Sequence, residues 1–254
     1  MTIAPHEEAM LAPIPGLIAV VGCDGTGKST LTHDLVRILG RYMPAQRRYL
    51  GLISGESGAR IKQWPWIGAR LERRLAAKAA QAQDMRNKAP GVWGALVMYG
   101  LSVWREAHLR RVCRLAGSGT LVITDRFPQA EVDGFRYDGP GLGLERSRHG
   151  LVRKLAQRER RLYERMARYR PMLVIKLHID LATAHARKPD HSCAELRDKI
   201  AVMARLRYNG AAVCDLDARA AYPQVLEQAL HAVADVVPSL APHLAKPAQI
   251  SEAT

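Results

Sequence analysis

The feature that most constrains the fold of this chain is a glycine-rich segment at residues 22–30, which reads Gly-Cys-Asp-Gly-Thr-Gly-Lys-Ser-Thr. A continuous apolar run at 17–21 precedes it, and leucine and isoleucine residues at helical spacing follow it over 28–39. The segment fits the pattern GxxxxGK[ST], in which a strand leads into a glycine loop that opens a helix. In such a loop, backbone N–H groups can approach phosphate oxygens, and the first helical turn adds unpaired donors. The segment therefore predicts a phosphate-binding loop.

Individual positions of this loop have distinct predicted roles. Lys28 can reach the β- and γ-phosphates of ATP as a point charge, and the Ser29 hydroxyl can ligate the Mg²⁺ ion that bridges them. The glycines lack the GxGxxG spacing, so a dinucleotide-binding loop is disfavoured. We predict ATP as phosphoryl donor, Mg²⁺ as its metal, and a nucleotide-binding set of Gly22, Asp24, Gly25, Thr26, Gly27, Lys28, Ser29 and Thr30.

A second apolar run, at 121–124, ends in Asp125 and Arg126. Asp125 can hold the metal through water or accept the acceptor's proton, and both roles stay open at this point. Arg126 can clamp an acceptor phosphate with two parallel hydrogen bonds. Asp180, which follows another apolar run, competes for the role of metal-binding acid and ranks second. We therefore predict Lys28, Asp125 and Arg126 as catalytic residues, with Ser29 and Asp125 at the metal.

The rest of the chain alternates between apolar runs typical of strands and segments of helical periodicity. Expected strands lie at 17–21, 48–53, 121–124, 172–179 and 213–216, and expected helices at 28–39, 71–88, 92–115, 151–169, 195–208 and 224–237. This alternation predicts an α/β fold, a five-stranded parallel sheet with helices on both faces. Ligands of such sheets bind at the carboxyl ends of the strands. We expect one domain at 16–238, a flexible leader at 1–15 and a flexible tail at 239–254.

Composition narrows the possible partners and the compartment. Lys and Arg outnumber Asp and Glu by 38 to 24, and the net charge of +14 favours anionic partners. A solvated face explains the basic helix at 151–170 best, so nucleic acid is a less favoured partner. The longest apolar stretch, 92–104, is shorter than the roughly 20 residues of a membrane-spanning helix. Four cysteines without close spacing indicate reduced thiols. We expect a cytoplasmic protein without a transmembrane segment.

The glycine loop, followed about a hundred residues later by a strand ending in Asp125-Arg126-Phe127, resembles the thymidylate kinase family. The resemblance covers about 17–237. It implies a P-loop nucleoside monophosphate kinase with a five-stranded parallel sheet, Mg·ATP as donor and a homodimeric state. The function it implies is transfer of the γ-phosphate to a small acceptor, with dTMP as the leading candidate.

The resemblance also implies roles for particular residues. Asp24 is expected to contact the acceptor sugar, and Arg126 and Arg105 the acceptor's phosphate. The segment at 182–196 corresponds to a small mobile lid, and 215–218 to the segment near adenine. The family places a catalytic arginine either in the loop or in the lid. Gly25 occupies the loop position here, so Arg187 is the expected catalytic cation, with Lys188 as its substitute.

The chain departs from the family after Arg126, where the family has a Ser and a Tyr-Gln pair that recognise thymine. Residues 128–140 here read Pro-Gln-Ala-Glu-Val-Asp-Gly-Phe-Arg-Tyr-Asp-Gly-Pro. This pattern resembles a divergent branch associated with surface-polysaccharide genes, so a nucleoside or a sugar or glycan is an alternative acceptor. Arg136 and Tyr137 either face that acceptor or pack the loop. A regulatory or nucleic-acid-binding NTPase is a further alternative, although 87–90 reads Asn-Lys-Ala-Pro and lacks the Asp of a GTPase motif.

Overall fold

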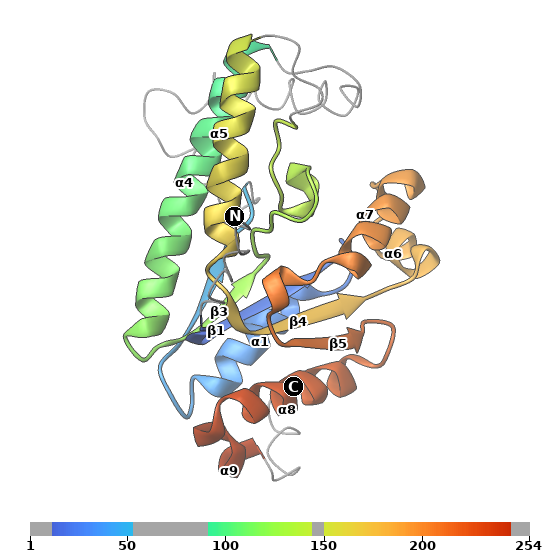
Figure 1. The fold of residues 1–254 in the computed structure, drawn as a ribbon. Helices are drawn as coiled ribbons and strands as arrows, with labels where there is room; N and C mark the ends of the chain where they lie inside the picture. The colour runs from blue at the N-terminus through green and yellow to red at the C-terminus, as the bar shows by residue number, and fades with distance from the viewer. Residues whose placement is uncertain (1–11, 53–90, 144–149, 245–254) are drawn as a thin grey trace, which may run out of the picture.

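The computed structural model describes residues 12–52, 91–143 and 150–244, and its centre is one parallel five-stranded sheet (Figure 1). The strands run in the order β2-β3-β1-β4-β5. Register pairs Ile18 of β1 with Ile123 of β3 on one side and with Leu173 of β4 on the other. The predicted α/β fold is confirmed, with strands β1 Ile14–Gly22, β2 Ala45–Tyr49, β3 Leu121–Asp125, β4 Pro171–His178 and β5 Val213–Asp217.

Helices cover both faces of the sheet. α4 and α5 lie side by side as a long pair against one face, and α1 and α8 cover the other (Figure 1). Side chains of β1 alternate between two cores: Ile18 and Val20 pack with α1 and α8, while Leu17, Ala19 and Val21 pack with α4 and α5. A strand buried on both faces needs a continuous apolar run, which is why β1 is so easily read in the sequence. The helices are α1 Lys28–Leu39, α4 Val92–Gly117, α5 Gly150–Ala167, α6 Leu181–Arg187, α7 Cys193–Arg205, α8 Tyr222–Val236 and α9 Ala241–Leu244, with 3₁₀ turns η1 Phe135–Tyr137, η3 Tyr208–Gly210 and η4 Pro238–Leu240.

Three of the differences from the expected boundaries bear on how the chain was read. β2 begins at Ala45, whereas the expected strand began at residue 48. The sequence placed it too late because this edge strand carries charged residues and shows no apolar run. β1 includes Ile14 and Pro15, which were expected in the leader. Within the expected tail, η4 and α9 extend the helical structure to Leu244, and Leu240 and Leu244 are buried in the core beneath α8. The helix expected at 71–88 lies outside the described residues.

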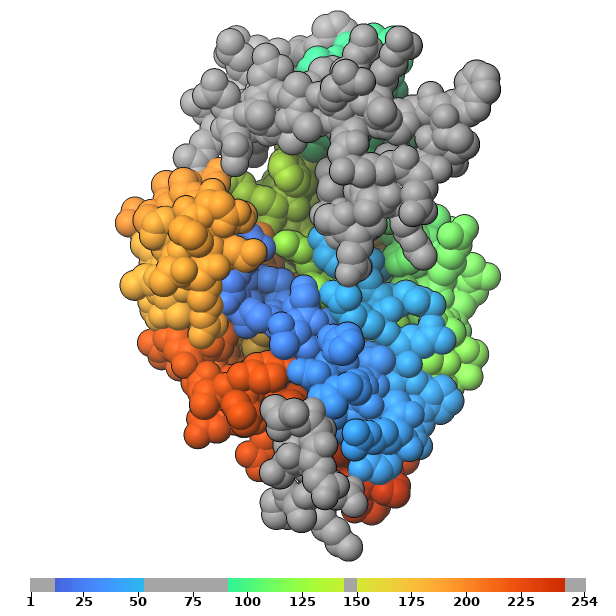
Figure 2. Space-filling model, turned by 180° about the vertical axis from the view of Figure 1, so that it is seen from behind, coloured from blue at the N-terminus to red at the C-terminus, as the bar shows by residue number. Residues whose placement is uncertain are grey.

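The sheet topology places the carboxyl ends of β1 and β3 beside each other at the centre of one edge, with β4 on the far side of β1. The glycine loop leaves β1 at this edge, and the Asp125-Arg126 pair leaves β3. Blue atoms near the start of α1 reach the surface beside the orange atoms of α6 and α7 (Figure 2). None of the helices in the described ranges is long and apolar enough to cross a membrane.

Candidate active site

The loop between β1 and α1 has the backbone conformation that its glycines allow. Gly25 and Gly27 have φ angles of 85° and 81°, in the left-handed region that other residues rarely adopt. A Cβ atom at Gly25 would lie 3.2 Å from the carbonyl oxygen of Ala184, so α6 packs directly on the loop. At Gly27 a Cβ would meet nothing within 4 Å among the described atoms. The loop is therefore covered at Gly25 and open at Gly27, where α1 begins.

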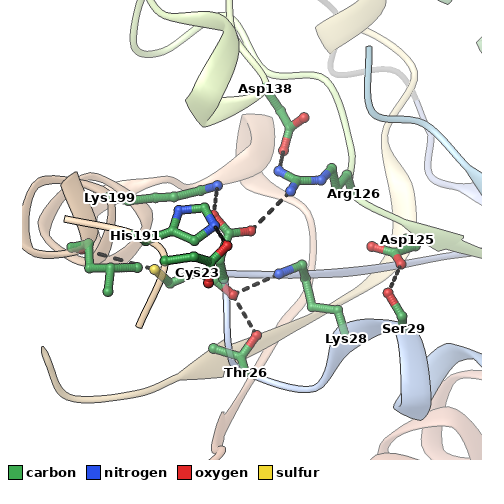
Figure 3. Close-up of polar contacts among 12 residues, drawn as sticks. Cys23, Thr26, Lys28, Ser29, Asp125, Arg126, Asp138, His191 and Lys199 are labelled. Atoms are coloured by element: carbon green, nitrogen blue, oxygen red, sulfur yellow. Dashed lines mark hydrogen bonds and ion pairs between the residues drawn. The ribbon is translucent and has the colours of Figure 1, made fainter. Parts of the chain in front are cut away.

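Lys28 and Thr26 both donate to the carbonyl oxygen of Cys23, over 2.7 and 2.8 Å (Figure 3). Lys28 is buried, and this burial, with the neighbouring charge of Arg126 adding to it, lowers the pKa of Lys28 to about 8. The nearby carboxylates of Asp24 and Asp125 attract this ammonium but do not make up for its burial, so it lacks a full counter-charge. The phosphates of a nucleotide would supply that charge, as the predicted role of Lys28 requires.

Ser29, in the first turn of α1, donates from its hydroxyl to Asp125 over 2.7 Å, so the structure brings the two expected metal ligands together (Figure 3). Asp125 is buried at the end of β3, and its same carboxylate oxygen also accepts from Arg47 over 3.0 Å. Hard oxygen ligands of this kind fit Mg²⁺, which takes few ligands from protein and the rest from phosphates and water. The described residues contain no group of three or more His, Cys, Asp or Glu side chains that could hold a metal unaided.

Sequence reasoning missed Arg47. It lies on β2, and its guanidinium also donates to Thr32 of α1 over 2.8 Å. Arg47 therefore fixes the Asp125 carboxylate beside α1 through contacts between three separate elements. The only available signal in the sequence was a pair of arginines in an edge strand, which is equally typical of a solvent-facing edge.

Arg126 follows Asp125 directly in the chain, but its side chain contacts a different set of residues. Its φ angle of 70° turns the chain sharply at the end of β3. Its guanidinium donates to Asp24 of the loop over 3.1 Å and lies 3.5 Å from the carboxylate of Asp138. Burial opposes the charged form of Arg126, but the carboxylates around it, Asp138 foremost, outweigh burial and raise its pKa. Arg126 is thus a permanent cation beside the glycine loop.

Lys199 of α7, which sequence reasoning also missed, completes this cluster. It is buried and donates from Nζ to Asp24 Oδ2 over 2.7 Å. Burial works to raise the pKa of Asp24, but Lys199 and then Lys28 outweigh it, so the pKa lies well below its usual value. Lys199 shares its face of α7 with Leu196, Val202 and Met203. A lysine among apolar residues at helical spacing was the signal that could have identified it.

Arg105 is fully buried and does not open toward an acceptor in this structure. It donates to the side chain of Asp138 over 2.9 Å, to the Asp138 carbonyl over 3.2 Å and to the Tyr163 hydroxyl over 3.4 Å. Asp138 therefore separates Arg105 from Arg126, since it pairs with both. The expected contact of Arg105 with an acceptor phosphate stays a prediction; in the structure the Asp138 carboxylate balances the charges of the buried Arg105 and the partly exposed Arg126.

The loop after Arg126 is held by its own polar side chains. Gln129 is buried and bonds four backbone groups, the nitrogens of Glu131 and Val132 and the carbonyls of Val132 and Tyr137. Tyr137 donates from its hydroxyl to Asp198 of α7, and Arg136 lies 3.9 Å from the same carboxylate. The structure thus places Arg136 and Tyr137 against α7, which favours the packing role that the sequence left open.

The expected lid segment, 182–196, spans most of α6 and the start of α7. Arg187 reaches the glycine loop: its guanidinium donates to the carbonyls of Gly25 and Ala218 over 3.2 and 3.0 Å. It thereby links the loop to the segment expected near adenine. Asp180 accepts from the backbone N–H of Thr183 and caps α6, a structural role that agrees with its second rank as metal-binding acid. Lys188 is exposed at the end of α6, and Thr30 is exposed in the first turn of α1.

A scan against models of known protein families found no match. Among curated proteins, "Uncharacterized ATP-binding protein YghR" of Escherichia coli K12 is 60% identical over 220 residues, covering 87% of each chain. "Uncharacterized ATP-binding protein YghS" of the same strain is 48% identical over 217 residues, covering 85% of this chain and 92% of its own. A solved structure, deoxyadenosine kinase from M. mycoides with bound dATP, aligns with 12% identity and a TM-score of 0.47, over 85% of this chain and 97% of that one. On the strength of the two E. coli relatives, the chain belongs to the family of YghR and YghS.

Proposed function

We propose that this protein is an ATP-dependent phosphotransferase that moves the γ-phosphate of Mg·ATP to a small acceptor. The observation that carries the proposal is the Ser29–Asp125 hydrogen bond of 2.7 Å, which joins the glycine loop to the acid at the end of β3. A hydroxyl and a carboxylate beside a buried lysine are the groups that the donor phosphates and their metal require. The names of YghR and YghS, ATP-binding proteins, support ATP as the nucleotide.

The chain's own residues divide the work of transfer between them. Backbone N–H groups at the start of α1 and the Lys28 ammonium bind the β- and γ-phosphates, in place of the Cys23 carbonyl that Lys28 now contacts. Ser29 and Asp125 would hold Mg²⁺, which when bound neutralises charge on the β- and γ-phosphate oxygens. Arg47 keeps the Asp125 carboxylate oriented. Arg187 exchanges its carbonyl partners for γ-phosphoryl oxygens as the lid closes, and so stabilises the charge of the transition state.

For the acceptor, a nucleoside monophosphate such as dTMP is our first candidate, as the resemblance to thymidylate kinases implies. Arg126 supports it, because a guanidinium at the end of β3 and beside the loop can hold an acceptor phosphate next to the donor. The second candidate is the hydroxyl of a nucleoside, sugar or glycan without a phosphate. The burial of Arg105 against Asp138 favours this alternative, since it removes one of the two arginines expected at an acceptor phosphate.

The test is a panel of nucleoside monophosphates, nucleosides and sugars scored by release of ADP from ATP in the presence of magnesium. We expect ADP release that depends on one acceptor class, that ends when magnesium is chelated, and that falls about a thousandfold in Lys28→Met. Lys154→Met, which changes an exposed lysine on α5, is the matched control and keeps wild-type rates. Release of ADP without any acceptor would instead support a regulatory NTPase, and release insensitive to Lys28→Met would refute the assignment of the loop.

The resemblance also leads us to propose a cytoplasmic homodimer. α4 supports a self-association surface because it exposes Trp93, Leu96, Val97, Val103 and Trp104 at helical spacing. Light scattering of the purified protein is expected to give twice the 28.1 kDa chain mass. A mass that drops toward the monomer in Val97→Glu would place the contact on α4, and a monomeric wild type would refute it.

A further inference from the structure

Two cations from different elements meet on one carboxylate of the glycine loop. Lys199 Nζ, from α7, lies 2.7 Å from Asp24 Oδ2, and Arg126 Nη2, from the end of β3, lies 3.1 Å from Asp24 Oδ1. Figure 3 shows Lys199 and Arg126 entering the same region above Lys28 from separate ribbons. Each oxygen of the carboxylate therefore has its own cation, which is the arrangement of an anion bound in a two-cation site.

Among the cations that the structure describes on the acceptor side, Lys199 is the one positioned to act with Arg126. Arg105 was expected to do so, but its side chain is fully buried and its two terminal nitrogens bond Asp138 and Tyr163. Lys28 bonds the loop carbonyl of Cys23 and lies on the donor side. Arg126 and Asp24 keep about a fifth of their side-chain surface exposed, 21% and 19%, so the cluster borders solvent rather than being sealed.

We infer that Arg126 and Lys199 form the subsite for the phosphate of the acceptor, and that the Asp24 carboxylate holds its place in the substrate-free protein. This inference rests on the proposed function, in its form with a phosphate-bearing acceptor. A phosphate monoester presents oxygens much as a carboxylate does, but it carries about −1.5 to −2 charges at neutral pH. It therefore outcompetes the single charge of Asp24 for the two cations.

Displacement of Asp24 has a consequence for the acceptor's sugar. Once the phosphate lies between Arg126 and Lys199, the Asp24 carboxylate is released at the same location and can accept a hydrogen bond from a sugar hydroxyl. This is the contact that the family resemblance implies for Asp24. One loop residue thus serves as an internal placeholder before binding and as a hydroxyl acceptor afterwards. A purely structural tether between α7 and the loop would instead affect stability without discriminating between acceptors with and without phosphate.

The test compares a monophosphate with its own nucleoside, so that base and sugar are held constant. The probe is whichever of dTMP, dAMP, dCMP and dGMP gives the highest rate, together with the matching deoxynucleoside. Dissociation constants are measured by calorimetry with the glycine loop saturated by ADP. The ratio of nucleoside to monophosphate constants reports the phosphate contact alone. We expect Lys199→Met to lower this ratio about tenfold and Lys199→Arg to keep most of it.

Two matched variants separate a binding role from a folding role. Lys176→Met removes another buried lysine, whose Nζ donates to the carbonyls of Ala204 and Leu206, and is expected to lower stability while leaving the ratio unchanged. Asp24→Asn removes the competing carboxylate and is expected to raise the ratio, the opposite sign to Lys199→Met. If Lys199→Met does not fold, the Asp24→Asn ratio decides the question.

The outcomes distinguish this inference from the proposed function. A wild type that phosphorylates monophosphates, with an unchanged ratio in Lys199→Met or a lowered or unchanged ratio in Asp24→Asn, overturns the assignment of Lys199 and Asp24 alone. A wild type that phosphorylates only hydroxyl acceptors overturns the monophosphate assignment, and the phosphate subsite with it. The inference is supported if the ratio of nucleoside to monophosphate dissociation constants falls in Lys199→Met, stays near wild type in Lys199→Arg and rises in Asp24→Asn.

Discussion

The proposed donor half and the proposed acceptor half of the candidate site are built in different ways. The donor half is one continuous segment: β1 leads into residues 22–29, and the loop's lysine bonds a carbonyl only a few residues away. The acceptor half is assembled from distant segments, because Asp24, Arg126, Asp138 and Lys199 come from the loop, the end of β3, the following loop and α7. A continuous site can form with local structure, whereas an assembled one depends on the whole fold.

The two halves also differ in how their charges are balanced. In the donor half, Lys28 is buried against a neutral carbonyl and lacks a full counter-charge. In the acceptor half, Arg105, Arg126 and Lys199 all have carboxylate partners. We therefore expect the donor half to be a source of instability in the free protein, and the acceptor half to contribute to stability. The predictions that follow test this contrast, beginning with the largest effect.

Asp125→Asn is expected to lower turnover about a thousandfold while leaving the fold intact, because it removes the carboxylate that faces Ser29 and that we propose as a metal ligand. Steady-state release of ADP measures the effect. The matched control is Asp180→Asn, which changes the competing acid: it should keep turnover within a few fold and leave stability close to wild type, since asparagine can cap α6 as aspartate does. The reverse pattern would identify Asp180 as the metal-binding acid.

Asp138→Asn is expected to lower the free energy of unfolding by about 3 kcal/mol, because it leaves the fully buried Arg105 without its carboxylate. The affinity for ADP should stay within threefold of wild type, because the donor loop makes its contacts independently. Urea denaturation gives the free energy of unfolding, and calorimetry gives the affinity for ADP. The double variant with Arg105→Met should recover part of the stability, and failure to recover any would argue against the ion pair as the cause.

Lys28→Met is expected to stabilise the ligand-free protein at pH 7 by about 2 kcal/mol, although it abolishes nucleotide binding. The pKa of Lys28 is about 8 in the folded state against 10.5 for a free lysine, so the unfolded chain binds the extra proton between these values. This group therefore penalises folding below pH 8, and the penalty fades as the pH rises toward 10.5. The difference corresponds to about 3 kcal/mol, reduced by loss of the bond to Cys23.

The measurement is the free energy of unfolding against pH, from 7 to 10.5, for wild type and Lys28→Met. The stability advantage of the variant should shrink across this window. If Lys28→Met were less stable than wild type at pH 7, the charge of Lys28 would be as well compensated in the free protein as the charges of the acceptor half.

Asp133→Asn should have the smallest effect, below about 0.5 kcal/mol on unfolding. Its carboxylate pairs with Arg160 over 2.7 Å, but both side chains are about a third exposed, so solvent screens the interaction. Comparison with Asp138→Asn, five positions along the same loop, shows how far burial sets the value of an ion pair. A loss above 1 kcal/mol would show that the acceptor loop depends on its surface contacts as well as on buried ones.

The same contrast explains how much could be predicted from the sequence. β1, β3 and β4 were located because strands buried on both faces read as apolar runs. The exposed edge strand β2 was shifted, since its charged residues carry no such pattern. The order at the C-terminal end was missed because Leu240 and Leu244 lie in elements of three and four residues, too short to show periodicity.

For the site, the donor residues Lys28 and Ser29 follow from one local pattern, and Asp125 and Arg126 from a strand end. The partners that organise them do not. Arg47 contacts Asp125 across 78 residues, and Lys199 contacts Asp24 across 175. Such contacts follow only from the completed sheet order and helix packing. Asp138 was hidden for another reason: it lies in a left-handed turn, where its identity suggests a turn residue rather than a bridge between two arginines.

The sharp turn at Arg126 determines how close the two halves of the site lie to each other. Asp125 contacts Ser29 at the start of α1 and Arg126 contacts Asp24 of the glycine loop, yet the residues are neighbours in the chain. Their Cα atoms are separated by one peptide unit, about 3.8 Å. Covalent bonds thus fix how closely Asp125 and Arg126 lie, whereas the positions of Lys199 and Arg187 depend on the packing of α7 and α6.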